Sequence, residues 1–397
     1  MNYTPEPIGV GRYSGELGAY LAKAGFLVDV VTASPHYPGW AVRGGYGNRY
    51  MTEYIDGARV THCPLFLTRK MRGIRRAVAP FSFALSSAPV VIWRALTLRP
   101  DTVLCVEPTL FAAPAGLLAA RLAGARTVLH VQDLEIDAAF GVHHLNGRLL
   151  KWLSNAVENR LLRSFDAVVT ISGRMGDKLK KKGVRPDRLS LVRNWVDLDR
   201  IKPLDRPSTY RAELGLSDRR FVALYAGNVG AKQALNILLD AAEKLVGEIG
   251  IVFVIAGDGP AKAGLVARYG HLPNVRFLPV QPEERLCDLL NLADVHVLPQ
   301  DRGAADLVLP SKLGGMLASG KPCIVMADPG TELYDFLGND AILLPPGNAD
   351  ALAKTVSALF RDSARPGAPS QIHDLSSLTA KHNLSRFKAI LTQRRQG

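Results

Sequence analysis

The sequence predicts an α/β protein made of two Rossmann-like domains in tandem. Short apolar, β-rich runs alternate with helix-length segments almost throughout, which is typical of parallel sheets covered by helices on both faces. The alternation stops and restarts around residues 197–207, a polar connector that contains proline. A chain of 397 residues is also long for one hydrophobic core and sufficient for two.

The apolar runs give the expected strands. In the first half they cover residues 28–33, 59–63, 102–106, 127–131, 167–171 and 189–193. In the second half they cover residues 221–226, 251–256, 275–279, 295–298, 323–326 and 341–344. Two such domains in tandem are expected to form a cleft at the carboxyl ends of both sheets.

The two ends of the chain depart from the alternation of strands and helices. Residues 1–13 resemble the loop after a first strand, with no strand before them, and residues 11–24 the first helix. We therefore expect the true start codon to lie upstream, so that the first sheet has lost a strand. The predicted domains are residues 1–198, without that strand, and residues 208–370. Residues 371–397 hold a basic amphipathic helix, expected at 375–396, that can return to the first domain.

The composition is that of a folded soluble protein, with 47% hydrophobic and 21% charged residues. The four cysteines are scattered and form no CxxC pair, which favours reduced thiols and a cytoplasmic location. Neither a signal peptide nor a metal-ligand cluster is recognisable.

The net charge of +13 is concentrated in the first half. Residues 1–200 hold 27 Lys and Arg against 16 Asp and Glu, whereas the remainder holds 22 against 20. A basic cluster at 69–76 leads into the apolar run 77–93, which is shorter than the ~20 residues of a spanning helix and is interrupted by Pro80 and Pro89. Two interpretations stay open: a core helix preceded by a solvated basic segment, and a surface that binds anionic lipid. Nucleic acid is disfavoured, because no aromatic platform accompanies the charge.

The second half holds the strongest candidate site. Two strands run into glycine-lined turns at 225–232 and 254–260, and a helix is expected to begin at Pro310. Strand ends that meet glycine turns, a lysine and helix starts are suited to a diphosphate. Lys232 can instead be a solvated surface lysine, and the second turn alone is generic. The candidate residues are Asn228, Lys232, Gly257, Asp258, Asp306, Leu309, Pro310, Ser311 and Lys312.

The first half offers fewer candidates. Gly9 and Gly11 precede a helix and permit close approach of a ligand, although a plain turn explains them nearly as well. His130 lies at the end of a strand and is followed by Gln132 and Asp133, and we expect this polar trio to face the cleft. There His130 can donate to a ligand oxygen and Asp133 can accept from a hydroxyl. The alternative is a capping aspartate beside a satisfied histidine.

The order of these motifs resembles that of the GT-B glycosyltransferases of family four. The matching series is Gly-Asn-x-x-x-Lys, Gly-Asp-Gly-Pro, Pro-Ser-Lys and Met-Leu-Ala-Ser-Gly-Lys-Pro. The opening Asn-Tyr-x-Pro-Glu-x-x-Gly-x-Gly-Arg-Tyr and the segment His-Val-Gln-Asp-Leu are similar to a narrower branch, the fucosyltransferase-like enzymes of colanic-acid and exopolysaccharide biosynthesis. The resemblance implies two Rossmann-like domains whose parallel sheets face each other across a cleft. It also implies retaining transfer from a nucleotide sugar, without metal or other cofactor.

The resemblance also implies roles for individual residues. Lys232 would meet the donor diphosphate, with Asn228 where many members carry arginine. The amides of 309–311 would face the sugar and phosphate, His130 would lie beside the transferred sugar, and Gly11 would line the donor cleft. The chain departs from the family at two glutamates eight positions apart, where it has Leu307 and Gly315; Asp306 can replace the first. His130, Asp133 and Lys232 are the candidate catalytic residues.

The expected function is sugar transfer to a saccharide acceptor on a lipid carrier, in bacterial exopolysaccharide biosynthesis. The basic first half suggests a cytoplasmic enzyme held peripherally at the inner face of the plasma membrane. Two alternatives stay open: a nucleotide-sugar epimerase, and a non-catalytic nucleotide-sugar-binding partner in polysaccharide assembly. A dinucleotide oxidoreductase is disfavoured, because no GxGxxG follows a strand.

Overall fold

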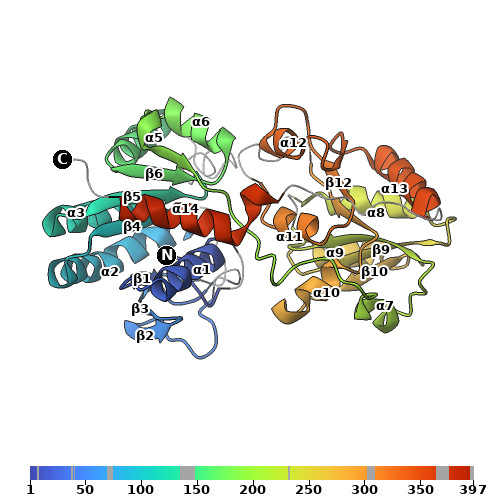
Figure 1. Cartoon of the computed structure of the whole chain (residues 1–397), viewed down its shortest axis with the longest axis horizontal. Coiled ribbons are helices and arrows are strands. Elements are labelled where there is room, and N and C mark those ends of the chain that lie inside the picture. The colour runs from blue at the N-terminus through green and yellow to red at the C-terminus, as the bar shows by residue number, and fades with distance from the viewer. Residues whose placement is uncertain are drawn as a thin grey trace. The chain divides into compact units, whose positions relative to one another are not determined.

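The chain divides into two compact units. The computed structural model describes residues 1–6, 9–36, 39, 41–68, 75–134, 148–230, 233–301, 309–363 and 375–393, and only the backbone at 75–77, 148–151 and 153. Unit 1 consists of Met1–Asn194 and His382–Gly397, and unit 2 of Trp195–Lys381 (Figure 1). Unit 2 is therefore inserted between two parts of unit 1.

Unit 1 holds two sheets. The first has the order β1-β3-β2, with β1 (Asp29–Ala33) parallel to β3 (Ala58–Cys63) and β2 (Met51–Ile55) antiparallel to β3. The second is fully parallel and has the order β4-β5-β6-β7. Its strands are β4 (Thr102–Glu107), β5 (Arg126–Val131), β6 (Ala167–Thr170) and β7 (Leu189–Leu191).

Strand β2 was not expected from the sequence. Its residues alternate between half-buried and exposed, so it lacks the continuous apolar run found at 221–226 and 251–256. Asp56 and Gly57, with φ of 49° and 84°, join β2 to β3 in a two-residue turn. Such a turn requires positive φ at both positions, and an Asp-Gly pair supplies it. The Asp-Gly pair was the signal that could have revealed this antiparallel hairpin.

In the described residues, five α-helices of unit 1 precede the connector, and one lies at the end of the chain. They are α1 (Val10–Lys23), α2 (Arg75–Leu98), α3 (Ala113–Ala123), α5 (Arg148–Arg163), α6 (Gly173–Lys181) and α14 (Ala380–Thr392). The last of these is bound to unit 1: Thr102 Oγ1 donates to the carbonyl of Leu391 over 2.8 Å, and Arg126 reaches Gln393 Oε1 over 3.1 Å. A 3₁₀ turn, Ser376–Leu378, occupies the start of the segment expected to be helical from 375.

Helix α2 differs from the expectation of an interrupted core segment. It runs without a break through Pro80 and Pro89. Phe83 and Val90 pack on β1 and β3, whereas Phe81, Leu85 and Trp93 are more than half exposed. By length and composition, Val78–Leu98 is the one helix in the described part of the chain that could cross a membrane.

Unit 2 is built on one parallel sheet with the order β10-β9-β8-β11-β12-β13. Its strands are β8 (Phe221–Ala226), β9 (Ile251–Ala256), β10 (Val275–Leu278), β11 (Val295–Leu298), β12 (Cys323–Met326) and β13 (Ile342–Leu344). Its helices are α7 (Thr209–Glu213), α8 (Leu235–Lys244), α9 (Lys262–Tyr269), α10 (Leu286–Leu290), α11 (Leu313–Ala318), α12 (Glu332–Leu337) and α13 (Ala349–Ser363). Residues of β8 and β9 are buried in clusters on both faces of the sheet, as the all-apolar strands predict.

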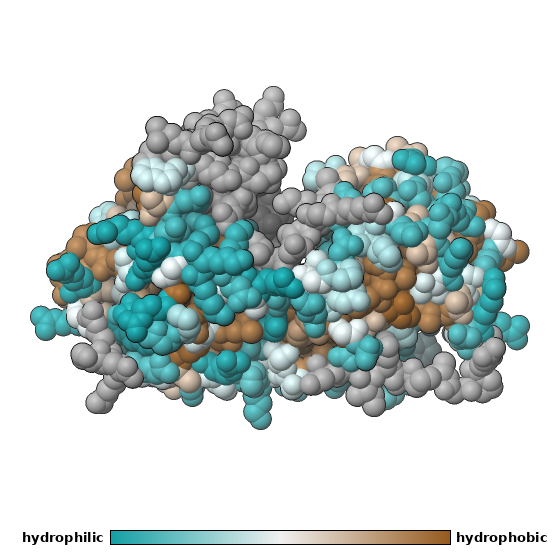
Figure 2. All heavy atoms as spheres, turned by 90° about the horizontal axis from the view of Figure 1, so that it is seen from above, coloured by the Kyte–Doolittle hydropathy of each residue, from teal (hydrophilic) through white to brown (hydrophobic). Residues whose placement is uncertain are grey.

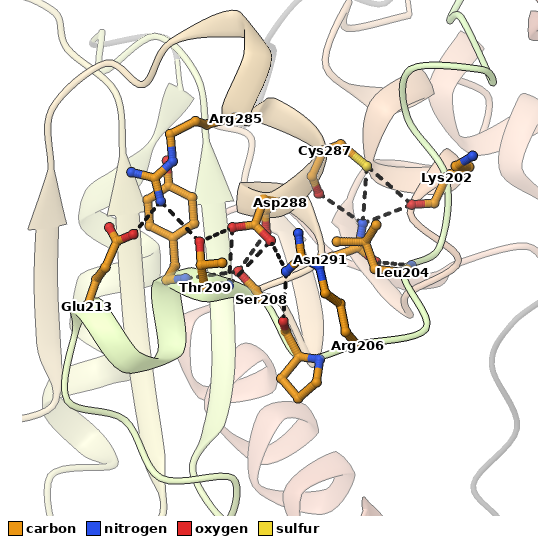
Figure 3. Close-up of polar contacts among 12 residues, drawn as sticks. Lys202, Leu204, Arg206, Ser208, Thr209, Glu213, Arg285, Cys287, Asp288 and Asn291 are labelled. Atoms are coloured by element: carbon orange, nitrogen blue, oxygen red, sulfur yellow. Dashed lines mark hydrogen bonds and ion pairs between the residues drawn. The ribbon is translucent and has the colours of Figure 1, made fainter.

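The connector between the units packs on unit 2 and is tied to α10 and the residues that follow it (Figure 3). Asn291 accepts from the amide of Leu204 over 3.0 Å and donates to the carbonyl of Lys202 over 2.9 Å. Asp288 accepts from the amide and hydroxyl of Thr209 and from Arg206 at 3.0 Å. These side chains fix the path by which the chain enters β8.

Candidate functional site

The carboxyl ends of β8 and β9 form an edge lined by glycine. A Cβ at Gly257 would lie 1.9 Å from the carbonyl oxygen of Gly227, and one at Gly259 would lie 2.4 Å from that of Val229. Both glycines also have positive φ, at 144° and 157°. Only glycine lets these two turns pack backbone against backbone. The structure therefore brings the two predicted turns together.

Polar side chains of the two turns reach the surface at this edge. The amide of Val229 donates to the carbonyl of Asp258 over 2.8 Å, which joins the turns. Asn228 and Asp258 are exposed. The Asp258 carboxylate accepts from the amide of Gly259 over 2.8 Å, so it keeps one oxygen directed to its own turn.

Lys312 places a half-buried cation at this edge. Its Nζ donates to the Tyr225 hydroxyl over 2.6 Å and lies 4.2 Å from the centre of the Tyr225 ring. The Tyr225 hydroxyl in turn donates to the carbonyl of Asn228 over 2.6 Å. The same Nζ lies 3.0 Å from the place where a Cβ of Gly227 would stand. Tyr225, which the sequence did not single out, thus positions the lysine beside the first turn.

The electrostatics of Lys312 are those of a cation without an anion. Burial lowers the pKa of Lys312 from 10.5 to about 8. Among the residues that the structure describes, no carboxylate lies within ion-pair distance of its Nζ. A buried ammonium group gains most from a negative ligand, because that ligand replaces the solvation lost on folding.

The segment before α11 differs in one detail from the prediction. The helix begins at Leu313 rather than at Pro310, and Pro310 instead accepts from the amide of Leu313 over 3.0 Å in a turn. Leu309 and Pro310 are half-buried, and Ser311 is exposed. Lys232 and Asp306 lie outside the described residues.

His130 does not occupy the open position that was expected for it. It is the penultimate residue of β5 and is 2% exposed, with its ring edge-on to Phe387 of α14 at 4.8 Å between centroids. Burial lowers the pKa of His130 to about 3, so the ring is neutral at physiological pH. The prediction that it faces a cleft is wrong, because the returning helix α14 covers it. Asp133 is exposed, and its carboxylate accepts from the amide of Leu134 over 2.9 Å.

The two N-terminal glycines have different surroundings. Gly9 precedes α1 with φ of 65° and has no atom within 4 Å of its Cβ position. Gly11 is buried, and a Cβ there would lie 2.8 Å from Glu6. Glu6 is itself buried and accepts from the amide of His36 over 3.1 Å. Gly11 therefore makes room for a buried carboxylate instead of lining an open surface.

A second polar edge lies in unit 1, where the sequence pointed to Gln132 but not to Thr170 or Asn194. At the ends of β5, β6 and β7, the side chains of Gln132, Thr170 and Asn194 lie largely out of solvent. Asn194 Nδ2 donates to Gln132 Oε1 over 3.5 Å. Gln132 Nε2, Thr170 Oγ1 and Asn194 Oδ1 are buried and have no hydrogen-bond partner among the residues that the structure describes. Buried groups of this kind normally have partners, so this edge is suited to a hydroxyl-bearing ligand.

Comparisons with known proteins agree with this organisation. A model of the glycosyl transferase 4-like domain matches residues 9–195, and a model of the glycosyl transferases of group 1 matches residues 220–362. A putative colanic acid biosynthesis glycosyl transferase, WcaI of Escherichia coli, is 38% identical over 364 residues, which cover 89% of this chain and 88% of that protein. The chain is a family 4 glycosyltransferase. The predicted family is thereby confirmed.

Solved structures confirm the predicted GT-B fold of this glycosyltransferase. Sucrose-phosphate synthase of Thermosynechococcus elongatus superposes with a TM-score of 0.67 at 17% identity, over 97% of this chain and 90% of that one. HepE of Anabaena, solved with UDP and glucose, superposes with a TM-score of 0.63 at 16% identity, over 92% of this chain and 100% of that one. At these identities the likeness concerns the fold alone.

Proposed function

We propose that this glycosyltransferase moves a sugar from a nucleotide-sugar donor, with retention of configuration and without metal, to a lipid-linked saccharide in polysaccharide biosynthesis of the colanic-acid type. The similarity to WcaI supports the type of polysaccharide. The observation that carries the donor assignment is Lys312, a half-buried cation with no described carboxylate partner at the glycine-lined edge of unit 2. A nucleoside diphosphate supplies the missing negative charge.

The reaction proposed for this edge transfers the sugar from the diphosphate to the acceptor in one step. The bond between the anomeric carbon and the diphosphate oxygen breaks, and its electron pair stays on the diphosphate. The acceptor oxygen forms the new bond on the same face of the sugar, and its proton passes to the departing diphosphate. Negative charge grows on the leaving group, where Lys312 and Lys232 are proposed to stabilise it. This route needs no nucleophilic carboxylate.

The proposed place for the acceptor is the second polar edge, in unit 1. Amide and hydroxyl side chains both donate and accept, so Gln132, Thr170 and Asn194 are suited to the hydroxyls of a neutral sugar. The excess of basic residues in the first 200 positions supports a peripheral location at an anionic cytoplasmic membrane surface, where a lipid-linked acceptor is found.

Thermal-shift measurements with UDP, GDP and their sugar conjugates test the donor assignment. We expect one of the two nucleotide series to raise the unfolding temperature of the wild type. The variants Lys312→Met and Lys232→Ala should lose most of that increase, whereas Lys354→Ala, which changes an exposed lysine of α13, should keep it. Equal shifts in all four proteins would contradict the diphosphate site.

Turnover assays then test the mechanism with the donor so identified. Near wild-type transfer by Lys232→Ala would remove that lysine from the reaction. Release of free nucleotide together with an epimerised sugar, in the absence of any acceptor, would favour the epimerase alternative instead.

A further inference from the structure

The outward side of α2 is apolar along its length. Its exposed positions recur with helical spacing and form one stripe: Val78, Phe81, Leu85, Pro89, Trp93 and Leu96. Phe81, Leu85 and Trp93 are 51%, 63% and 58% exposed. A helix on the surface of a soluble domain normally places charged or polar residues on this side. Helix α2 is instead apolar on both its inward and its outward sides.

Helix α3 and the short turn before it continue this surface. Phe111, Leu118 and Leu122 are each about half exposed and again recur with helical spacing. Helices α2 and α3 pack against each other, and the rings of Phe81 and Phe111 meet edge-on at 6.1 Å. The two stripes therefore adjoin, and we call them together the α2–α3 apolar face. Figure 2 shows apolar (brown) side chains gathered at the left of unit 1, where Figure 1 draws α2 and α3.

The charged residues within the two helices have one sign. Residues 75–98 and 110–123 contain no Asp or Glu. The cationic residues within the two helices beyond position 78 are Arg94 and Arg121. Arg94 lies over the Trp93 ring at 4.9 Å, and Arg121 is exposed. In the sequence, Arg69, Lys70, Arg72, Arg75 and Arg76 directly precede the apolar part of α2.

We propose that the α2–α3 apolar face inserts into the headgroup and upper acyl region of an anionic bilayer. An apolar face whose helices hold no acidic residue, and which basic residues precede in the sequence, matches an anionic lipid surface, which combines hydrocarbon with negative headgroups. The biological sense of this contact rests on the proposed function, since a lipid-linked acceptor would lie in the same membrane.

Insertion parallel to the membrane fits the packing better than a spanning helix. The inward stripe of α2, including Phe83 and Val90, packs against β1 and β3 in the core of unit 1. A helix that crossed the bilayer would have to leave these contacts. Large exposed apolar patches on soluble proteins mark interaction sites, and the one-sided charge favours lipid over a second copy, whose own basic residues would meet the same face.

Vesicle co-sedimentation tests the proposal with phosphatidylcholine vesicles that contain or lack phosphatidylglycerol. The double variant Phe81→Glu/Leu85→Glu places two carboxylates in the face, at positions exposed enough to leave the core intact. Ile249→Glu, at a 77% exposed apolar position of unit 2, is the matched control. Trp93→Gln is a milder second variant in case the double variant does not fold, and circular dichroism checks the fold of all four proteins.

We expect the wild type to bind the anionic vesicles and to retain part of this binding at about 0.5 M salt, since apolar insertion is not screened. The double variant should bind about tenfold more weakly, Trp93→Gln should be intermediate, and Ile249→Glu should equal the wild type. Wild-type binding by the folded face variants, or binding fully lost at high salt, would overturn the proposal. So would a wild-type dimer, seen by light scattering, that the double variant converts to a monomer without any vesicle binding.

The two proposals fail in distinguishable ways, because vesicle binding is measured without any sugar. A protein that responds to UDP or GDP but ignores vesicles refutes only the membrane face. A protein that binds vesicles through this face but gains no stability from either nucleotide refutes only the donor site.

Discussion

Replacement of Lys312 by methionine should stabilise unit 2 while removing its anion site. Methionine keeps a long apolar stem and lacks the ammonium group. Because burial lowers the pKa of Lys312, folding disfavours its charged form. In the absence of nucleotide at pH 7, we therefore expect Lys312→Met to unfold at a higher temperature than the wild type.

The size of this stabilisation follows from the pKa of Lys312 in the unfolded and in the folded chain. A pKa lowered from 10.5 to about 8 corresponds to about 3 kcal/mol of unfolding free energy. Below pH 8 the lysine is protonated in both states and the folded state bears the full cost. As pH rises from 8 to 10.5 the folded state loses its proton first, and the cost disappears. Methionine also loses the hydrogen bond to Tyr225, worth about 1 kcal/mol. The net gain at pH 7 is about 2 kcal/mol, or about 5 °C for a unit of this size.

Scanning calorimetry at pH 7 and at pH 10 measures this difference in the transition of unit 2. Lys354→Met, an exposed lysine of α13, serves as the control and should change neither temperature. The gain of Lys312→Met should vanish at pH 10, and UDP or GDP should stabilise the wild type more than the variant. A lower unfolding temperature for Lys312→Met at pH 7, or the same difference at both pH values, would refute the argument from burial.

Three further substitutions test other parts of the structure. Burial lowers the pKa of His130 from 6.5 to about 3, so the wild type should lose stability as pH falls below 6.5. Measured by urea unfolding, the drop in unfolding free energy from pH 7 to pH 5 should be about 2 kcal/mol smaller for His130→Leu. Asp288→Ala removes the acceptor of Thr209 and should lower the unfolding free energy of unit 2 by about 2 kcal/mol; an unchanged thermal transition would contradict the role of this network. Gly257→Ala forces a Cβ against the Gly227 carbonyl and should cost about 3 kcal/mol or more; wild-type thermal stability would show that the turns are not packed as described.

The central strands of unit 2 could be predicted because they are buried on both faces and therefore appear as apolar runs. The predicted run at 221–226 coincides with β8, and the run at 251–256 with β9. The missed strand, β2, lies at the edge of its sheet and has no such run. Its Asp-Gly turn is typical of a β-hairpin, and a pattern of apolar runs does not include it.

The candidate site was predictable only where backbone geometry decides it. Gly257 and Gly259 are required by close backbone approach, which leaves a trace in the sequence. The pairing of Lys312 with Tyr225 joins residues 87 positions apart and leaves none. His130 was misplaced for the same reason, since the residue that covers it, Phe387, lies near the other end of the chain.

The return of α14 to unit 1 has a consequence for biosynthesis. Everything that unit 2 needs, residues 195 to 381, is contiguous and leaves the ribosome before the residues that seal His130. Nascent unit 2 can therefore begin to fold before α14, the helix that completes unit 1, has emerged. Unit 1 can complete its packing only after the whole chain has been translated.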